Sequence, residues 1–286
     1  MDGKILRAVG GIYEVEIDGQ RFLCKARGIF RNRSISPCAG DLVRISAEDN
    51  AEPIIEEIYE RKNVLVRPPL ANLDIAVLVI SSCEPAPNTY VIDKLIAVFE
   101  EKGIESVLVF TKMDKADCAE LASIYENIGY RCFFTDNLTG EGTKPLQDYL
   151  KGRTAALIGN SGVGKSSLIN CIFPDLEKQT GEISRKLGRG RHTTREVTLY
   201  PYHGGYIADT PGFSTVEIGR YANIQKKDLK DCFREFSGRE CRFADCVHLK
   251  ETGCGVREAL EAGEISESRY RNYARIFGEL SELEKK

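Results

Sequence analysis

The stretch GNSGVGKS at residues 159–166 decides the fold of this chain. An apolar run at 154–158 precedes it, and a segment with helical periodicity, 167–173, follows it. This strand–loop–helix context is what a phosphate-binding loop requires, because its glycines let backbone N–H groups and a helix N-terminus wrap the phosphates. We expect Lys165 to reach the β- and γ-phosphates and to act in catalysis, and Ser166 to hold Mg²⁺. The predicted phosphate-binding residues are Gly159, Asn160, Ser161, Gly162, Val163, Gly164, Lys165, Ser166 and Ser167.

The sequence around this loop, 64–217, alternates continuous apolar strands with amphipathic helices and predicts one α/β domain. The predicted elements cover 73–80, 90–101, 105–110, 117–128, 130–134 and 154–158. Such a series forms a mostly parallel sheet, whose ligands bind beyond the carboxyl ends of the strands. The chemistry should therefore lie in the loops after Phe110, Phe134, Ile158 and Ala208.

A second phosphate-binding signal is DTPG at 209–212, directly behind the apolar stretch 206–208. Asp209 fits the carboxylate that supports Mg²⁺ together with Ser166, and the N–H of Gly212 fits the sensor of a γ-phosphate. Taken alone, such a tetrapeptide often forms a simple turn. Its place behind a strand and after the phosphate loop favours the nucleotide role.

The tetrapeptide TKMD, residues 111–114, follows the predicted strand 105–110 and is similar to the Asn-Lys-x-Asp guanine element of GTPases. A carboxylate at Asp114 accepts hydrogen bonds from the ring N–H and the exocyclic amine of guanine, whereas adenine would leave it unpaired. The stem of Lys112 would cover one face of the base. The predicted guanine-binding residues are Thr111, Lys112, Met113 and Asp114.

Two features depart from the usual guanine site. Thr111 stands where Asn is usual, so one amide is missing. The loop 135–140, TDNLTG, occupies the place of a Ser-Ala-Lys loop but matches it only by position. The discriminating carboxylate of Asp114 is retained, and GTP is still the predicted nucleotide.

The first 63 residues alternate like an antiparallel β domain, with Val15 and Ile17 on one face and a hairpin turn at 18–19. Short strands, basic residues and interleaved aromatic side chains favour a five-stranded barrel of the oligonucleotide-binding (OB) kind that contacts RNA. An SH3-like barrel would give much the same pattern.

The region 218–286 is polar and mostly helix-prone, and a cysteine cluster interrupts it. Three thiolates and one imidazole fall within a short stretch, which is the ligand set of a closed, structural zinc site. The predicted ligands of this single Zn²⁺ are Cys241, Cys246, His248 and Cys254.

The order of the motifs is unusual, because the guanine motif and the loop 135–140, here called the base loop, precede the phosphate loop and DTPG. Common GTPases begin at the phosphate loop, so this chain resembles the circularly permuted GTPases. With GRGRHTT at 188–194 and the cysteine cluster, it resembles the ribosome small-subunit-dependent GTPase A family (RsgA/YjeQ type) over nearly its whole length. That resemblance implies a GTP hydrolase that binds the small (30S) ribosomal subunit and its rRNA, assists late maturation of the subunit, and is stimulated by it.

The segment 188–194 should contain the catalytic switch. Thr193 or Thr194 is expected to complete the Mg²⁺ and γ-phosphate coordination, and we favour Thr194. Phe213 occupies the place of the water-orienting glutamine of many GTPases, so another group must do this work. His192 is the candidate, since the resemblance also implies a catalytic histidine and imidazole can position water near pH 7. The alternative is a surface histidine that contacts RNA phosphates.

Composition is consistent with this hypothesis. The chain has 286 residues and a net charge of −3, so RNA must be met through local basic patches such as 21–33 and 185–195. No apolar run suits a membrane span or a signal peptide, and we expect a cytoplasmic monomer that binds GTP or GDP.

Two rival functions come from other classes. One is a P-loop phosphotransferase that uses the zinc region as a lid, which Lys112 and Asp114 disfavour because a kinase need not recognise guanine on its donor. The other is a zinc-stabilised RNA-binding switch in which hydrolysis is incidental. Competition of ATP with GTP for the site would favour the phosphotransferase. An RNA affinity that does not depend on the bound nucleotide would favour the RNA-binding switch.

Overall fold

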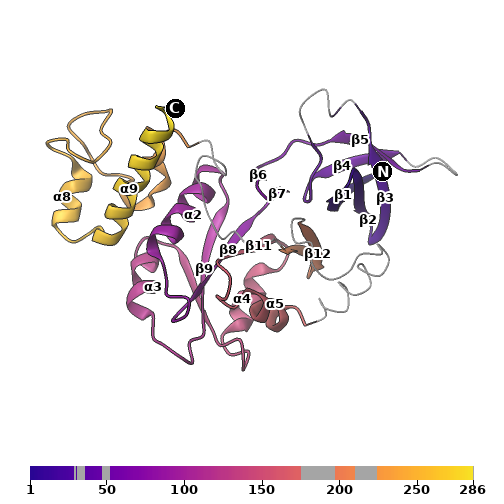
Figure 1. Ribbon diagram of the computed structural model, residues 1–286, viewed down its shortest axis with the longest axis horizontal. Helices are drawn as coiled ribbons and strands as arrows, with labels where there is room; N and C mark the ends of the chain where they lie inside the picture. Colours follow the sequence, from indigo (N-terminus) through magenta and orange to yellow (C-terminus); the bar gives the residue numbers. More distant parts are fainter. Residues whose placement is uncertain (29, 31–35, 47–51, 175–196, 210–223, 286) are drawn as a thin grey trace.

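The computed structural model describes residues 1–28, 30, 36–46, 52–174, 197–209 and 224–285 (Figure 1). An N-terminal barrel and a C-terminal helical unit lie on opposite sides of a central α/β unit (Figure 1). The domain boundaries at 63/64 and 217/218 stay predictions. Among the described residues, no helix is both long and apolar enough to cross a lipid bilayer.

The N-terminal unit is a closed five-stranded barrel. Its strands are β1 (Asp2–Val9), β2 (Ile12–Ile17), β3 (Gln20–Ala26), β4 (Leu42–Ser46) and β5 (Ile54–Ile58). They follow the order β1-β2-β3-β5-β4, and pairing of β1 with β4 closes the ring. Asp18 and Gly19 both have positive φ, 49° and 78°, as the predicted two-residue turn requires. Closure and the parallel β3–β5 pair confirm the OB-like barrel.

The central unit is a parallel sheet in the order β10-β9-β8-β11-β13, with β12 antiparallel at its edge. Its strands are β8 (Ile75–Ser81), β9 (Glu105–Thr111), β10 (Arg131–Thr135), β11 (Thr154–Ile158), β12 (Thr198–Tyr202) and β13 (Gly205–Asp209). Its helices are α2 (Thr89–Glu101), α3 (Ala119–Glu126), α4 (Thr143–Leu150) and α5 (Lys165–Ile172). Alternate strand residues supply two separate cores, since successive side chains point to opposite faces. One core contacts α2 and α3, and the other contacts α4 and α5.

The central elements named in the sequence are all present, with bounds that differ by at most two residues. Four elements of the central region were missed: α4, β12, and the two strands of a hairpin, β6 (Val64–Val66) and β7 (Pro69–Ala71). Pro145 in the first turn of α4 and Pro201 within β12 weaken the sequence signal for both elements.

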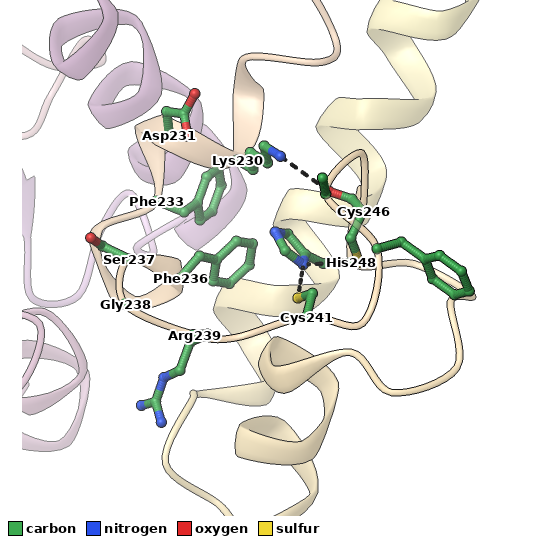
Figure 2. A pocket seen from close by; sticks show the side chains of 12 residues that line it. Lys230, Asp231, Phe233, Phe236, Ser237, Gly238, Arg239, Cys241, Cys246 and His248 are labelled. Atoms are coloured by element: carbon green, nitrogen blue, oxygen red, sulfur yellow. Dashed lines mark hydrogen bonds between the residues drawn. The ribbon is translucent and has the colours of Figure 1, made fainter.

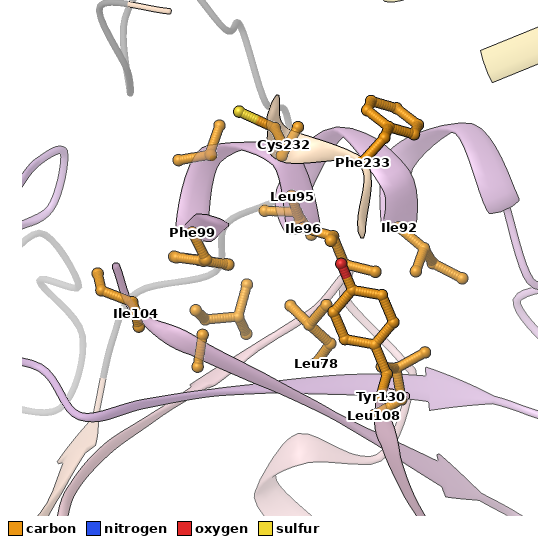
Figure 3. Packing of buried hydrophobic residues seen from close by; sticks show 14 of the residues in the cluster. Leu78, Ile92, Leu95, Ile96, Phe99, Ile104, Leu108, Tyr130, Cys232 and Phe233 are labelled. Carbon is orange, nitrogen blue, oxygen red and sulfur yellow. The ribbon is translucent and has the colours of Figure 1, made fainter. Parts of the chain in front are cut away.

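The C-terminal unit contains two short 3₁₀ helices, η1 (Leu229–Cys232) and η2 (Arg234–Phe236), followed by α8 (Gly255–Glu261) and α9 (Glu267–Leu283). In Figure 3, α2 has the sheet residues Leu78 and Leu108 on one side, and Cys232 and Phe233 on the other. Helix α2 is therefore the element on which the C-terminal unit is packed.

Candidate functional site

The predicted phosphate loop connects β11 to α5, as the sequence indicated. A side chain at Gly159 would place its Cβ 2.5 Å from the carbonyl oxygen of Val79, and Gly164 has a φ of +97°. Both positions therefore require glycine. The Lys165 ammonium donates hydrogen bonds to the carbonyl oxygens of Gly159 and Asn160, each at 2.6 Å, and lies over its own loop. Burial lowers the pKa of Lys165 below its usual value.

The predicted guanine motif lies against this loop. Thr111 is fully buried at the end of β9, whereas Asp114 is exposed. Lys112 has a φ of 61°, which is strained for a residue with a side chain. Its ammonium donates to the carbonyl oxygen of Gly162 at 2.9 Å and also to that of Glu84. This lysine thus spans from the guanine motif to the phosphate loop, which places the two predicted halves of a nucleotide site together.

The base loop after β10 reaches the same sheet edge. Asp136 accepts hydrogen bonds from the Thr139 hydroxyl at 2.7 Å and from the Leu138 backbone N–H at 2.8 Å. These hydrogen bonds lower the pKa of Asp136. Sequence reasoning placed this loop only by position and missed Asn137, whose side chain contacts the phosphate loop.

The switch residues cannot be placed in the same way. His192, Thr193, Thr194 and Gly212 lie outside the described residues. Asp209 ends β13, and β13 pairs in parallel with β11, the strand that leads into the phosphate loop. The backbone of Asp209 therefore reaches the carboxyl edge of the sheet where the phosphate loop begins.

The second predicted site is a compact Cys₃His cluster. The ligand atoms of Cys241, Cys246, His248 and Cys254 all lie within 4.8 Å of one another. The Nδ1 atom of His248 is 3.5 Å from the sulfur of Cys241 and 3.4 Å from that of Cys246 (Figure 2). It is 3.3 Å from the sulfur of Cys254. Burial, together with the two neighbouring thiols, raises the pKa of Cys246 above its usual value. These four side chains form a candidate metal centre.

The scaffold of the cluster comes from the rest of the C-terminal unit. The hydroxyls of Tyr270 and Tyr273 on α9 donate to the carbonyl oxygens of His248 and Val247, each at 2.7 Å. Although burial opposes it, backbone N–H groups of the ligand loop hold the pKa of Glu251 at about 2. An open cavity of about 490 Å³ lies beside the cluster (Figure 2). The ligand loop is thus fixed from α9 and by its own carboxylate.

The described basic residues of the N-terminal patch are more fully paired than the sequence suggests, while Arg31 and Arg33 lie outside the described residues. Arg21 pairs with Glu14 at 2.8 Å, and Lys25 pairs with Glu52 at 2.5 Å. Arg27 likewise pairs with Glu56 at 2.6 Å. The three carboxylates belong to Glu14 in β2, Glu56 in β5 and Glu52. Because all three lie outside 21–33, the charge of that segment alone does not indicate the pairing. The patch 185–195 lies outside the described residues.

Comparisons with known proteins agree with this geometry. Residues 58–219 match the RsgA GTPase family, and residues 2–55 match the RsgA N-terminal domain family. The chain is 43% identical over 289 residues to the small ribosomal subunit biogenesis GTPase RsgA of a Geobacillus species, covering 98% of each chain. It is 44% identical over 280 residues to the protein of that name from Thermotoga petrophila, covering 96% of this chain and 94% of the relative.

Two solved structures are similar over the whole architecture. The crystal structure of YjeQ from Thermotoga maritima has a TM-score of 0.83 at 38% identity and covers 98% of both chains. The structure of YloQ, described as a circularly permuted GTPase, has a TM-score of 0.81 at 34% identity. It covers 99% of this chain and 95% of that one.

Proposed function

Because the chain belongs to the RsgA family of circularly permuted GTPases, we propose that it binds the small ribosomal subunit and hydrolyses GTP faster when bound. It is a GTPase of small ribosomal subunit biogenesis. The main structural support for a nucleotide site is the hydrogen bond from the Lys112 ammonium to the carbonyl oxygen of Gly162, which links the guanine motif to the phosphate loop.

We assign guanine to the segment 111–114 and the phosphates to the segment 159–167. Asp114 is exposed at the end of the guanine motif, so its carboxylate is free to meet the base edge. Ser166 is exposed in the first turn of α5, where the helix N-terminus favours an anion and its Mg²⁺. In this proposal Mg²⁺ is held by Ser166 and Asp209, and the N–H of Gly212 contacts the γ-phosphate.

The hydrolytic step is assigned to the switch segment. His192 positions the attacking water, and Thr194 completes the coordination of Mg²⁺ and the γ-phosphate. Lys165 stabilises negative charge as it develops on the transferred phosphoryl group. Its present hydrogen bonds to Gly159 and Asn160 are of a kind that a phosphate would replace.

The Cys₃His cluster is proposed to hold one structural Zn²⁺. Tetrahedral zinc with its usual bond lengths separates two sulfurs by about 3.8 Å and a sulfur from a nitrogen by about 3.5 Å. The observed spacings are 3.9 Å for Cys241–Cys254 and 3.3–3.5 Å around His248. Four protein ligands leave no open coordination position for catalysis.

The partners follow from the family rather than from one contact. We propose that the barrel and the C-terminal unit contact rRNA of the small subunit, and that the protein works late in maturation as a cytoplasmic monomer. The three exposed ion pairs of the barrel would exchange carboxylates for RNA phosphates, which makes binding dependent on salt.

The deciding experiment measures GTP turnover of the purified chain alone and with small subunits, with large subunits and ATP as controls. We expect slow GTP hydrolysis that rises with small subunits only, and no use of ATP. His192→Ala should abolish most of that rise, by about a hundredfold or more for a lost water-positioning group. A turnover rate that small subunits do not change would contradict the proposed stimulation by the ribosome. Equal hydrolysis of ATP and GTP would overturn the guanine assignment.

A further inference from the structure

Thr111, the first residue of the guanine motif, offers fewer hydrogen-bond donors than the asparagine that is usual there. Thr111 is fully buried, and its hydroxyl oxygen lies 2.6 Å from the carbonyl oxygen of Val163 and 3.3 Å from that of Ile80. A hydroxyl carries one proton, whereas the asparagine usual at this position carries two amide protons. The single proton of Thr111 can therefore serve only one of these two carbonyls, and the shorter distance identifies it as that of Val163 in the phosphate loop rather than that of Ile80 in β8.

A second side chain reaches the next carbonyl of the same loop. Asn137, in the base loop after β10, donates from Nδ2 to the carbonyl oxygen of Gly164 at 3.1 Å. A Cβ built on Gly164 would lie 3.1 Å from this Nδ2 and 3.4 Å from the Thr111 hydroxyl oxygen. The two side chains thus converge on one point of the phosphate loop from two different strands.

The position of Asn137 is itself fixed. Its Oδ1 accepts a hydrogen bond from the Thr135 hydroxyl at 3.1 Å, which sets the orientation of the amide. The Cys171 thiol of α5 lies 3.0 Å from the Asn137 carbonyl oxygen and holds its backbone. The amide can therefore act as a rigid support.

We propose that Asn137 supplies the amide donor that the guanine motif lacks at Thr111, so that the pair together positions the phosphate loop. The peptide bond is planar and trans, so its C=O and N–H point in opposite directions. Anchoring the carbonyl of Val163 directs the N–H of Gly164 away from Thr111, and anchoring that of Gly164 likewise directs the N–H of Lys165. These are the backbone groups that a phosphate-binding loop turns towards its phosphates.

The Gly164 carbonyl also accepts the first helical hydrogen bond of α5, from the Leu168 N–H at 2.8 Å. Asn137 uses the second lone pair, so the support does not compete with the helix. Asn137 is thus a positioning residue, which acts on the nucleotide through the backbone of the loop. This inference rests on the assignment of 111–114 as the guanine motif.

The test titrates a fluorescent GDP analogue into the wild-type protein and four variants, with an adenine analogue as a control. Asn137→Ala should weaken GDP binding about tenfold, the loss expected for one buried hydrogen bond and its unpaired partner. Asn137→Asp keeps the size and the acceptor for Thr135 but loses the donor, so it should weaken binding at least as much. Lys144→Ala, on the surface of α4 and outside the base loop, has a side chain that is 72% exposed and should leave binding unchanged.

The decisive variant is Thr111→Asn combined with Asn137→Ala. Asparagine at position 111 restores the missing donor, so the double variant should recover most of the affinity lost by Asn137→Ala alone. Melting temperatures without nucleotide identify any variant that fails to fold. Unchanged affinity in Asn137→Ala, or no recovery in the double variant, would overturn the inference. A wild-type protein that binds no guanine nucleotide would instead overturn the assignment of the guanine motif.

Discussion

The two outer units are attached to the central sheet in opposite ways. The C-terminal unit meets α2 through apolar side chains such as Phe233 and, in addition, through buried charges, since Arg269 and Asp93 are only 1% and 0% exposed. The barrel meets the sheet through backbone pairing of β1 with β12, in which Arg7 is opposite Thr198. We expect the C-terminal junction, which adds a buried charge network, to be the more rigid of the two.

The C-terminal junction is a closed network of charges. Arg269 on α9 donates to Asp93 on α2 at 2.6 Å and to Glu235 at 2.7 Å. Asp93 also accepts hydrogen bonds from Asn272 at 2.6 Å and from Tyr125 at 2.9 Å. Burying such charges gains little net stability, but each depends on its partners being in place. The network therefore specifies how α9 lies on α2.

The barrel junction is more open. The Tyr206 hydroxyl donates to Glu16 at 2.7 Å, and the Lys4 ammonium lies 4.3 Å from the centre of the Tyr206 ring. An open groove of about 690 Å³ runs along this junction. Leu6 and Ala39 of the barrel reach the main core, so the contact is partly apolar. Because the barrel junction contains no buried ion pair among the described residues like that of Arg269 and Asp93, we expect it to accept small rotations more readily.

The largest expected effect is loss of the metal ligand Cys254. Binding of structural zinc contributes on the order of 10 kcal/mol to small zinc domains, so Cys254→Ser should unfold the C-terminal unit. Limited proteolysis should then cut within 224–285, while the barrel and GDP binding persist. Cys232→Ser is the control, because this buried thiol lies in the same unit but outside the cluster. A variant that keeps one zinc per chain and resists protease would contradict the prediction.

The next effect tests the charge network itself. Arg269→Ala leaves Asp93 and Glu235 buried without their cation, which should lower the free energy of unfolding by about 3–5 kcal/mol. Arg271→Ala on the same helix removes only the exposed pair with Glu267 and should cost about 0.5 kcal/mol or less. Urea denaturation of both variants measures the difference. Equal losses would show that the C-terminal junction does not depend on its buried charges.

The sequence predicted the elements whose signals are local. The phosphate loop, the guanine motif and the Cys₃His cluster each place their chemistry within a few consecutive residues, and the strands and helices around them have clear periodicity. The structure brings the predicted loops to one sheet edge, as the carboxyl-end rule requires. The roles of the individual nucleotide-site residues remain predictions.

The junctions could not be predicted, because their partners are distant in sequence. Nothing near Arg7 indicates that β1 continues the sheet beside Thr198. Arg269 lies in a charged segment that resembles a solvated helix, and only tertiary packing makes it one of the most buried side chains. Asn137 was missed for a similar reason, since the role proposed for its amide depends on the positions of Thr111 and Gly164, which are distant in sequence.

The smallest effect concerns the barrel junction. Tyr206→Phe removes one hydrogen bond to Glu16, which should cost about 1 kcal/mol and act locally. Burial and the Glu16 carboxylate raise the pKa of Tyr206, so its hydroxyl stays protonated and the bond persists through mildly alkaline pH. Hydrogen exchange should accelerate about fivefold in β1 and β12, while α9 is unchanged.

Tyr59→Phe is the matched control, because the partners of its hydroxyl among the described residues, Asp2 and Arg44, both belong to the barrel. It should leave exchange in β12 at the wild-type rate. If Tyr206→Phe also accelerated hydrogen exchange in α9 relative to the wild-type protein, the two junctions would be coupled. The contrast between a fixed C-terminal unit and an adjustable barrel would then be wrong, because loosening one junction would loosen the other.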